Sequence, residues 1–186
     1  MSKLRVVDLF SGAGGLTFGF YYNLINESFV RRDNVEFVFS NEYATQAVKA
    51  FKKNYGENIP VIAGDICDIN DEMIGQYMND QDVDIIIGGP PCQSWSEAGA
   101  LRGIEDARGQ LFFEIARIVK EKRPQVVFLE NVANLLEHDD GKTFLAVYNA
   151  LVPYGYTLKY RVIDAIDYGN IPQHRTRIFI VAFLDN

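Results

Sequence analysis

The sequence predicts an α/β fold in which a doubly wound, mostly parallel sheet carries one antiparallel strand near the C-terminus. Three observations indicate this class. Short β-branched apolar runs alternate with segments of helical periodicity. The first run, 4–10, leads into a glycine-rich turn at 11–15 and an apolar helix start at 16–24. Polar or small residues follow each of the first five strands, at the sheet edge where such folds bind ligands.

The remaining elements continue this alternation. Strands are predicted at 35–40, 59–63, 83–87 and 125–129, and helices at 44–55, 70–78, 111–122 and 142–152. Two further strands, 156–165 and 177–182, are joined by residues 166–176. Residues 93–108 are a long polar connection that contains glycines, and loops of that length are often lids.

Composition indicates one globular domain over residues 1–186, because 48% of the residues are hydrophobic. Two cysteines are too few for a disulfide framework, and no apolar run approaches the roughly 18 residues of a membrane span. The two histidines have no ligand partners at useful spacing, so no metal is expected. We expect a cytoplasmic protein without membrane contact.

The net charge of −7 disfavours autonomous binding to a polyanion. Lysine and arginine normally neutralise the phosphates of nucleic acids, and acids outnumber them here by 25 to 18. A nucleic-acid substrate therefore requires a local basic cleft, or a basic surface on another polypeptide.

Cys92 is the strongest candidate for a catalytic residue. It follows Gly88-Gly89-Pro90-Pro91 at the carboxyl end of a predicted strand. The prolines fix φ, so the turn presents the thiol rigidly. A cysteine is more often a small buried hydrophobe, but a core position needs neither these prolines nor the polar run that follows. A nucleophile needs a fixed approach and partial exposure. Cys67 lacks such a turn and is assigned to packing.

Other strand ends carry groups suited to a nucleotide-like ligand. Glycines of the first turn allow backbone N–H groups to face a phosphate or an amino-acid carboxylate. Glu42 is placed to accept hydrogen bonds from ribose hydroxyls, although an acid near a helix start is an equal alternative. Tyr43 is suited to stacking on a purine, Asp65 to an exocyclic amine and Ile66 to packing on a ring. Glu130 brings a second carboxylate to the same edge.

In order and spacing, these segments resemble the motifs of the cytosine-C5 DNA methyltransferases. The matching segments are Asp8-Leu9-Phe10-Ser11-Gly12-Ala13-Gly14-Gly15, Asn41-Glu42-Tyr43, Gly64-Asp65-Ile66, Pro90-Pro91-Cys92-Gln93, Glu130-Asn131-Val132 and Gln173-His174-Arg175-Thr176-Arg177. The resemblance spans nearly the whole chain. It implies a Rossmann-like, S-adenosylmethionine-dependent methyltransferase fold.

The resemblance also implies residue roles. The Cys92 thiolate would add to C6 of cytosine, while Glu130 stabilises charge at N3, a role that calls for a raised pKa. Arg177, with Arg175 beside it, would polarise O2. Residues that would hold S-adenosylmethionine are Phe10, Gly12, Gly14, Gly15, Glu42, Tyr43, Asp65, Ile66, Pro90 and Leu111. Residues that would close over a flipped cytosine of DNA are Gln93, Ser94, Ser96, Arg108 and Gly109.

The chain departs from the family by lacking the target recognition domain and the last motif, whose helix returns to the glycine turn. We therefore expect an incomplete catalytic domain that works with a second polypeptide supplying both parts, and an exposed apolar face beside residues 16–21. A shortened form of a longer enzyme is the alternative. A tRNA cytosine-C5 methyltransferase would use the same catalytic residues. A non-catalytic cofactor-binding or regulatory module would not need Cys92, Glu130 and Arg177.

Overall fold

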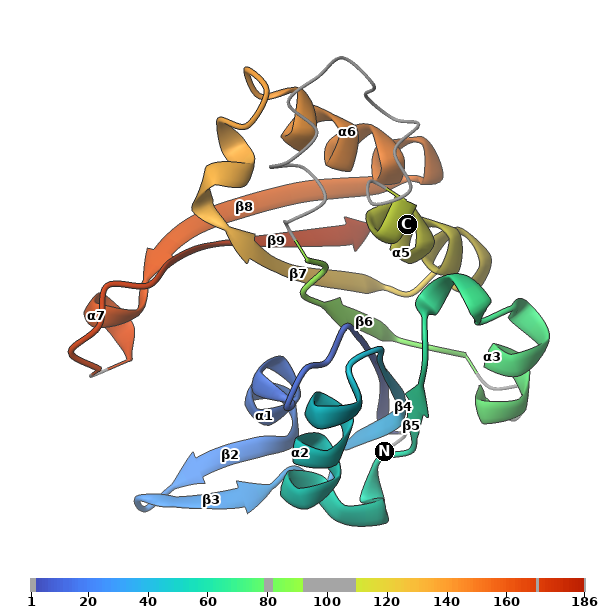
Figure 1. Cartoon of the computed structure of the whole chain (residues 1–186), viewed down its shortest axis with the longest axis vertical. Helices are drawn as coiled ribbons and strands as arrows, with labels where there is room; N and C mark the ends of the chain where they lie inside the picture. Colours follow the sequence, from blue (N-terminus) through green and yellow to red (C-terminus); the bar gives the residue numbers. More distant parts are fainter. Residues whose placement is uncertain (1–2, 79–81, 92–109, 170, 186) are drawn as a thin grey trace. The chain divides into compact units, whose positions relative to one another are not determined.

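The computed structural model describes residues 3–78, 82–91, 110–169 and 171–185 (Figure 1). The chain divides into two compact units, residues 1–89 with 122–125 and residues 90–121 with 126–186. The expectation of one domain over 1–186 stays a prediction. No helix in the described ranges is both long and apolar enough to cross a membrane.

A parallel sheet forms the core of the first unit. Its strands are β1 (Leu4–Leu9), β4 (Val35–Glu42), β5 (Val61–Ala63) and β6 (Ile85–Gly88), in the order β5-β4-β1-β6. The pairings of β1 with β4 and β6, and of β4 with β5, are all parallel. Parallel strands are usually buried on both faces, which explains the nearly continuous burial of β4. Their carboxyl ends meet at one edge, as the sequence predicts.

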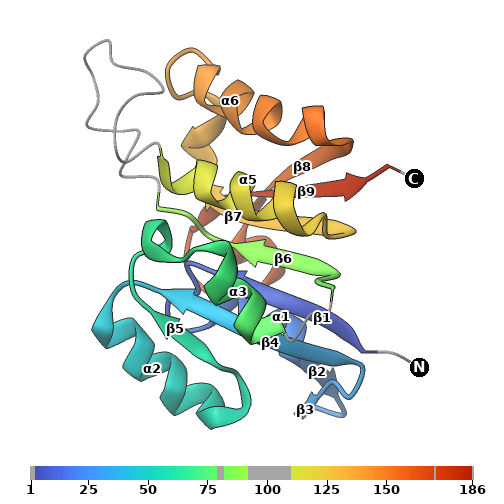
Figure 2. The same ribbon diagram turned by 90° about the vertical axis from the view of Figure 1, so that its right-hand side faces the viewer.

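Helices cover both faces of this sheet. They are α1 (Gly15–Tyr21), α2 (Thr45–Tyr55) and α3 (Asp71–Met78), with the short turns η1 (Gly56–Asn58) and η2 (Ile66–Asp68). The register of β1 with β4 skips Val38. Phe37 consequently contacts Tyr21 of α1, and Phe39 contacts Tyr77 of α3, with ring centroids 5.9 and 5.8 Å apart. Figure 2 shows α1 and α3 on opposite sides of the strands.

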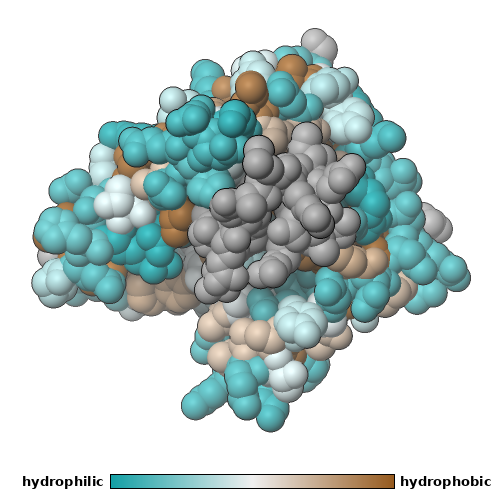
Figure 3. Space-filling model, turned by 45° about the horizontal axis from the view of Figure 1, so that its top comes forward, coloured by the Kyte–Doolittle hydropathy of each residue, from teal (hydrophilic) through white to brown (hydrophobic). Residues whose placement is uncertain are grey.

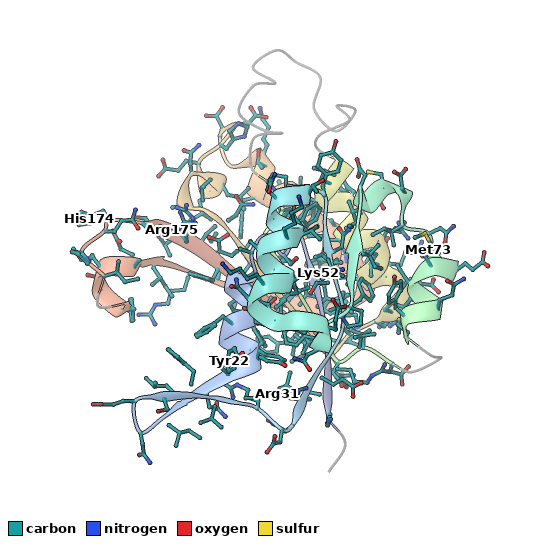
Figure 4. All side chains as sticks on the ribbon, turned by 60° about the horizontal axis from the view of Figure 1, so that its bottom comes forward. Tyr22, Arg31, Lys52, Met73, His174 and Arg175 are labelled. Carbon is teal, nitrogen blue, oxygen red and sulfur yellow. The ribbon has the colours of Figure 1, made fainter. Side chains whose placement is uncertain are left out.

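A β-hairpin that the sequence does not predict follows α1. β2 (Tyr22–Ile25) pairs antiparallel with β3 (Ser28–Arg31), and Figure 4 shows Tyr22 and Arg31 on these strands. The predicted helix over 16–24 is therefore wrong beyond Tyr21. The turn residues Asn26 and Glu27 have φ of 48° and 62°, the left-handed pair that a two-residue hairpin needs. Because no glycine stands there, the usual Asn-Gly signal is absent.

The second unit contains a three-strand sheet and its helices. They are α5 (Gln110–Lys122), β7 (Val126–Val132), η3 (Ala133–Leu136), α6 (Lys142–Leu151), η4 (Val152–Tyr154), β8 (Tyr156–Asp164), α7 (Ala165–Tyr168) and β9 (Thr176–Leu184). β9 lies between β7 and β8 and runs antiparallel to both, which confirms the predicted antiparallel strand. Phe112 of α5 and Val147 of α6 line one small hollow with Leu129 and Ile180, so both helices pack on the same face.

Candidate functional site

The glycine turn after β1 has a left-handed backbone. Phe10, Gly12 and Gly14 have φ of 59°, 57° and 93°. Glycine adopts such angles without strain, whereas Phe10 does so only in a turn that its surroundings hold. A Cβ at Gly12 or Gly15 would meet nothing within 4 Å, but a Cβ at Gly14 would overlap the Tyr55 ring. The turn therefore borders open space at Gly12 and Gly15 and is closely packed at Gly14.

Two side chains at the end of α2 hold this turn by its carbonyl groups. Asn54 Nδ2 donates to the oxygen of Ala13 at 2.9 Å, and Tyr55 Oη donates to that of Gly14 at 2.5 Å. Burial raises the pKa of Tyr55 to about 12, so its hydroxyl stays protonated and remains a donor. The sequence analysis did not single out either residue, because a bond across more than forty residues leaves no local pattern.

Glu42 lies at the end of β4, where the sequence predicts it. Its Oε2 accepts a hydrogen bond from the Gly12 N–H at 2.8 Å, and its Oε1 accepts one from the Ala44 N–H at 2.7 Å. These bonds fix the carboxylate beside the glycine turn. Each carboxylate oxygen can accept more than one hydrogen bond, so Glu42 can still receive hydroxyl groups of a ligand.

The other predicted adenosine contacts differ in accessibility. Tyr43 is 74% exposed and available for stacking. Asp65 Oδ1 accepts from the Cys67 N–H at 3.0 Å and caps η2. Ile66 is 2% exposed, so its side chain belongs to the core and offers little surface to a ring.

Cys67 is exposed, which contradicts its assignment to packing. Successive side chains of a 3₁₀ turn such as η2 point about 120° apart, so the burial of Ile66 does not extend to Cys67.

Asp8 is a buried acid inside β1 that the sequence analysis left without a role. Its side chain is fully buried, its Oδ2 accepts from the Thr17 hydroxyl, and its Oδ1 has no hydrogen-bond partner in the described structure. Burial raises the pKa of Asp8 to about 7, the Thr17 bond opposes this, and the charge of Glu42 adds to it. The available signal was an acid between the apolar residues Val7 and Leu9 within a predicted strand.

The second unit brings two predicted catalytic residues together. Arg177 Nε lies 3.0 Å from Glu130 Oε1, with 21% and 24% of the two side chains exposed. Glu130 lies opposite Phe179 and Arg177 opposite Val132, so the pair is a diagonal contact between β7 and β9. Arg175 is exposed, and its backbone N–H is bound by Asp164.

Asn131 links two of the sequence motifs within the second unit. Its Nδ2 donates to the Pro90 carbonyl at 3.0 Å, and its Oδ1 accepts from the Val132 N–H at 2.8 Å. Asn131 and Pro90 are both buried, while Leu111 is half-buried in the first turn of α5. Asn131 thus holds the segment that leads to the predicted nucleophile.

Several predicted site residues lie outside the described residues: Cys92, Gln93, Ser94, Ser96, Arg108 and Gly109. Within the described ranges, no group of three or more histidine, cysteine, aspartate or glutamate side chains is arranged to hold a metal ion.

Comparison with known proteins decides the family. A model of the C-5 cytosine-specific DNA methylase family matches residues 4–186. The chain belongs to the C-5 cytosine-specific DNA methylase family. This confirms the resemblance inferred from the motifs.

Curated relatives in this family are type II methyltransferases. M1.ScrFI of Lactococcus lactis subsp. cremoris is 42% identical over 182 residues, covering 98% of this chain and 42% of the relative. M.HhaI of Haemophilus parahaemolyticus is 42% identical over 183 residues, covering 98% of this chain and 50% of the relative. The chain spans about half the length of these relatives.

Solved structures confirm the α/β methyltransferase fold. The Entamoeba histolytica methyltransferase EhMeth has a TM-score of 0.76 and 26% identity, covering all of this chain and 54% of that one. The Dnmt2 methyltransferase of S. pombe has a TM-score of 0.71 at 24% identity, covering all of this chain and 51% of that one.

Proposed function

We propose that this chain is the catalytic core of an enzyme that transfers a methyl group from S-adenosylmethionine to C5 of cytosine in DNA, within a restriction–modification system. The observation that carries the proposal is the Glu130–Arg177 pair, at 3.0 Å, in a chain that retains Pro90-Pro91-Cys92-Gln93. The type II methyltransferases among its relatives support the setting. A non-catalytic module would have no use for both features.

The chemistry requires a nucleophile and charge stabilisation on opposite parts of the ring. C5 is a poor nucleophile until the Cys92 thiolate adds to C6 and moves an electron pair towards N3 and O2. Glu130 would hold a proton or hydrogen bond at N3, and Arg177 would bind O2. N3 and O2 are both bonded to C2, so two side chains already in contact can serve both. After methylation, loss of the C5 proton expels the sulfur and restores the double bond.

The first unit has features that fit S-adenosylmethionine, which supplies a methyl group activated on a sulfonium. The glycine turn borders open space at Gly12 and Gly15. The buried hydroxyl of Ser11 has no hydrogen-bond partner in the described structure, so a ligand group can satisfy it. Phe10 and the glycine turn would hold the methionine and adenosine parts, Glu42 the ribose and Asp65 the adenine amine.

Methyl transfer from labelled S-adenosylmethionine to DNA and RNA tests the proposal. Cys92→Ser is expected to abolish transfer without changing cofactor affinity, because the thiol acts on the base.

Glu42→Ala and Asp65→Ala are expected to weaken cofactor binding by about 1–3 kcal/mol each, measured by calorimetry. Unchanged affinity for S-adenosylmethionine in both variants would contradict the proposed cofactor site. Transfer to RNA alone would favour the tRNA enzyme, and wild-type turnover by Cys92→Ser would refute the nucleophile.

We further propose that a second polypeptide completes the enzyme by docking on the open face of β7, β9 and β8, defined by Phe128, Ile163, Phe179 and Val181 with Lys159 and Arg161 at its rim. A hollow of about 390 Å³ lies over these residues. An antiparallel sheet that leaves one face to water normally places polar side chains there, whereas this face carries apolar ones, so it suits another element. The basic rim favours an amphipathic helix with acidic flanks.

An exposed apolar face is also expected beside residues 16–21 of the first unit. There the side chain of Phe18 is 39% exposed and packs on Phe29.

A further inference from the structure

Asp164 stands at the junction between β8 and the segment that leads to β9. Its Oδ1 accepts from the backbone N–H of Arg175 at 2.9 Å and from that of Ile166 at 3.3 Å. Its Oδ2 accepts from the Thr176 hydroxyl at 3.2 Å and lies 3.1 Å from His174 Nδ1. One carboxylate therefore joins both ends of the segment 165–175. Figure 4 shows His174 and Arg175 at this end of the strand pair.

These contacts favour a carboxylate rather than a neutral acid. The Arg175 N–H, and after it the His174 ring, hold the pKa of Asp164 well below its usual range, at about 2. The Asp164 side chain is one-fifth exposed, so both water and the protein donors can hydrogen-bond to its carboxylate. Asp164 is thus charged throughout the neutral pH range.

Capping of α7 explains only a small part of this arrangement. The cap uses the Ile166 N–H, whereas the other contacts reach the two residues before β9 and its first residue, Thr176. Asp164 also lies opposite Thr176 in the strand register, next to the pair Ile163 and Arg177. The carboxylate therefore clamps the first residues of β9 at a defined position.

The contact with Thr176 lies directly beside Arg177, the predicted O2-binding residue. Arg177 is the second residue of β9, and its guanidinium reaches Glu130 from the face that it shares with Ile163. A register slip of one residue would turn the side chain to the other face. We propose that Asp164 is a positioning residue that fixes the register of β9 so that Arg177 meets Glu130. The inference rests on the proposed function for its catalytic meaning.

Hydrogen exchange of the Arg177 Nε–H in the isolated 186-residue chain tests the inference, with the NMR resonance assigned by its loss in Arg177→Lys. Asp164→Ala is expected to accelerate exchange by about tenfold, and Glu130→Gln, which removes the charged partner, is expected to do the same. Asp164→Asn keeps an oxygen for the Arg175 N–H and is expected to stay within about threefold of wild type. Asp167→Asn, which removes a nearby exposed acid, is the matched control and is expected to change nothing.

A folded Asp164→Ala variant with wild-type exchange would overturn the inference. So would equally fast exchange in Asp164→Asn and Asp167→Asn, because charge rather than hydrogen bonding would then be the cause. If Asp164→Ala does not fold, Thr176→Val removes one donor to the carboxylate and is expected to accelerate exchange by about threefold, and wild-type exchange there would count against the role.

The exchange measurement needs neither cofactor nor DNA, so it is independent of whether the chain methylates. In the transfer assay, Asp164→Ala is expected to lower kcat by about tenfold while leaving the affinity for S-adenosylmethionine unchanged. Normal exchange behaviour in a chain that shows no transferase activity even with the co-expressed partner would refute the proposed function and leave the positioning role intact.

Discussion

Asp8 illustrates how the fold changes the chemistry of a single residue. Burial raises its pKa from 3.8 to about 7. Between these values the unfolded chain releases the proton while the folded chain keeps it. The contribution of Asp8 to stability is therefore present below the unfolded pKa and falls as pH rises towards the folded one.

Asp8→Asn is expected to remove this dependence, because an amide does not titrate. Relative to the variant, the wild-type free energy of unfolding is expected to fall by about 3 kcal/mol between pH 5 and pH 8, measured by urea denaturation. Thr17→Val removes the hydrogen bond that lowers the pKa of Asp8. In this variant the loss of stability with rising pH is therefore expected to occur at higher pH. Identical pH dependence in wild type and Asp8→Asn would contradict the buried, raised acid.

The turn between β1 and α1 predicts a different loss of stability for alanine at each of its three glycines. Gly14→Ala is expected to cost several kcal/mol, of order 3–5, because the new Cβ overlaps the Tyr55 ring and φ is 93°. Gly12→Ala meets only the backbone cost of φ 57°, about 1–2 kcal/mol. Gly15→Ala has open space and no positive φ, so its free energy of unfolding is expected to stay near wild type.

Thermal or urea unfolding of the three glycine variants supplies the measurement. We predict that Gly14→Ala loses the most stability, Gly12→Ala less and Gly15→Ala the least. Equal losses at Gly14 and Gly15 would mean that the turn does not pack against Tyr55. Loss of cofactor affinity in Gly15→Ala at normal stability would show that the open space beside it is used by the ligand.

The elements with strong local patterns were predictable from the sequence. The apolar runs of β1, β4 and β7 were predicted correctly, and Glu42 ends β4 as expected, but β7 continues past Glu130 to Val132. The β2–β3 hairpin was not, because its turn uses Asn26 and Glu27 with positive φ instead of glycine.

The supports of the site were also beyond a linear analysis. Tyr55 with Gly14, and Asn131 with Pro90, join residues 41 positions apart, and Asp164 gathers donors from the next strand. Only the fold brings such partners together. The pair Glu130 and Arg177 was expected as two catalytic groups, but their direct contact follows from the β7–β9 register.

At the scale of the whole molecule, net charge and apolar surface are the two features that motivate the proposed partner. The charge of −7 gives little attraction for DNA phosphates. The coloured residues in Figure 3 are mostly hydrophilic, whereas the open face of the second unit is lined by Phe128, Phe179 and Val181. A basic, DNA-reading part on another polypeptide would account for both features.

Co-expression with the part of M.HhaI that this chain does not match is the probe for that polypeptide. We expect it to improve solubility and to permit DNA methylation. Phe179→Asp is expected to abolish co-purification, while Leu145→Asp, at a 55% exposed position on α6, is expected to leave it unchanged. Equal co-purification of both variants would exclude the open face, and sequence-specific methylation by the isolated chain would refute the need for a partner.

Covalent trapping on DNA containing 5-fluorocytosine tests the central claim most directly. Fluorine cannot leave C5 as the proton does, so methylation stops with the enzyme sulfur still bound to C6. With S-adenosylmethionine and the co-expressed partner present, mass spectrometry is expected to find the modified base on Cys92 in the wild type and no adduct in Cys92→Ser. An adduct that persists in Cys92→Ser, or methylated DNA without a trapped intermediate, would contradict the assignment of Cys92 as the nucleophile.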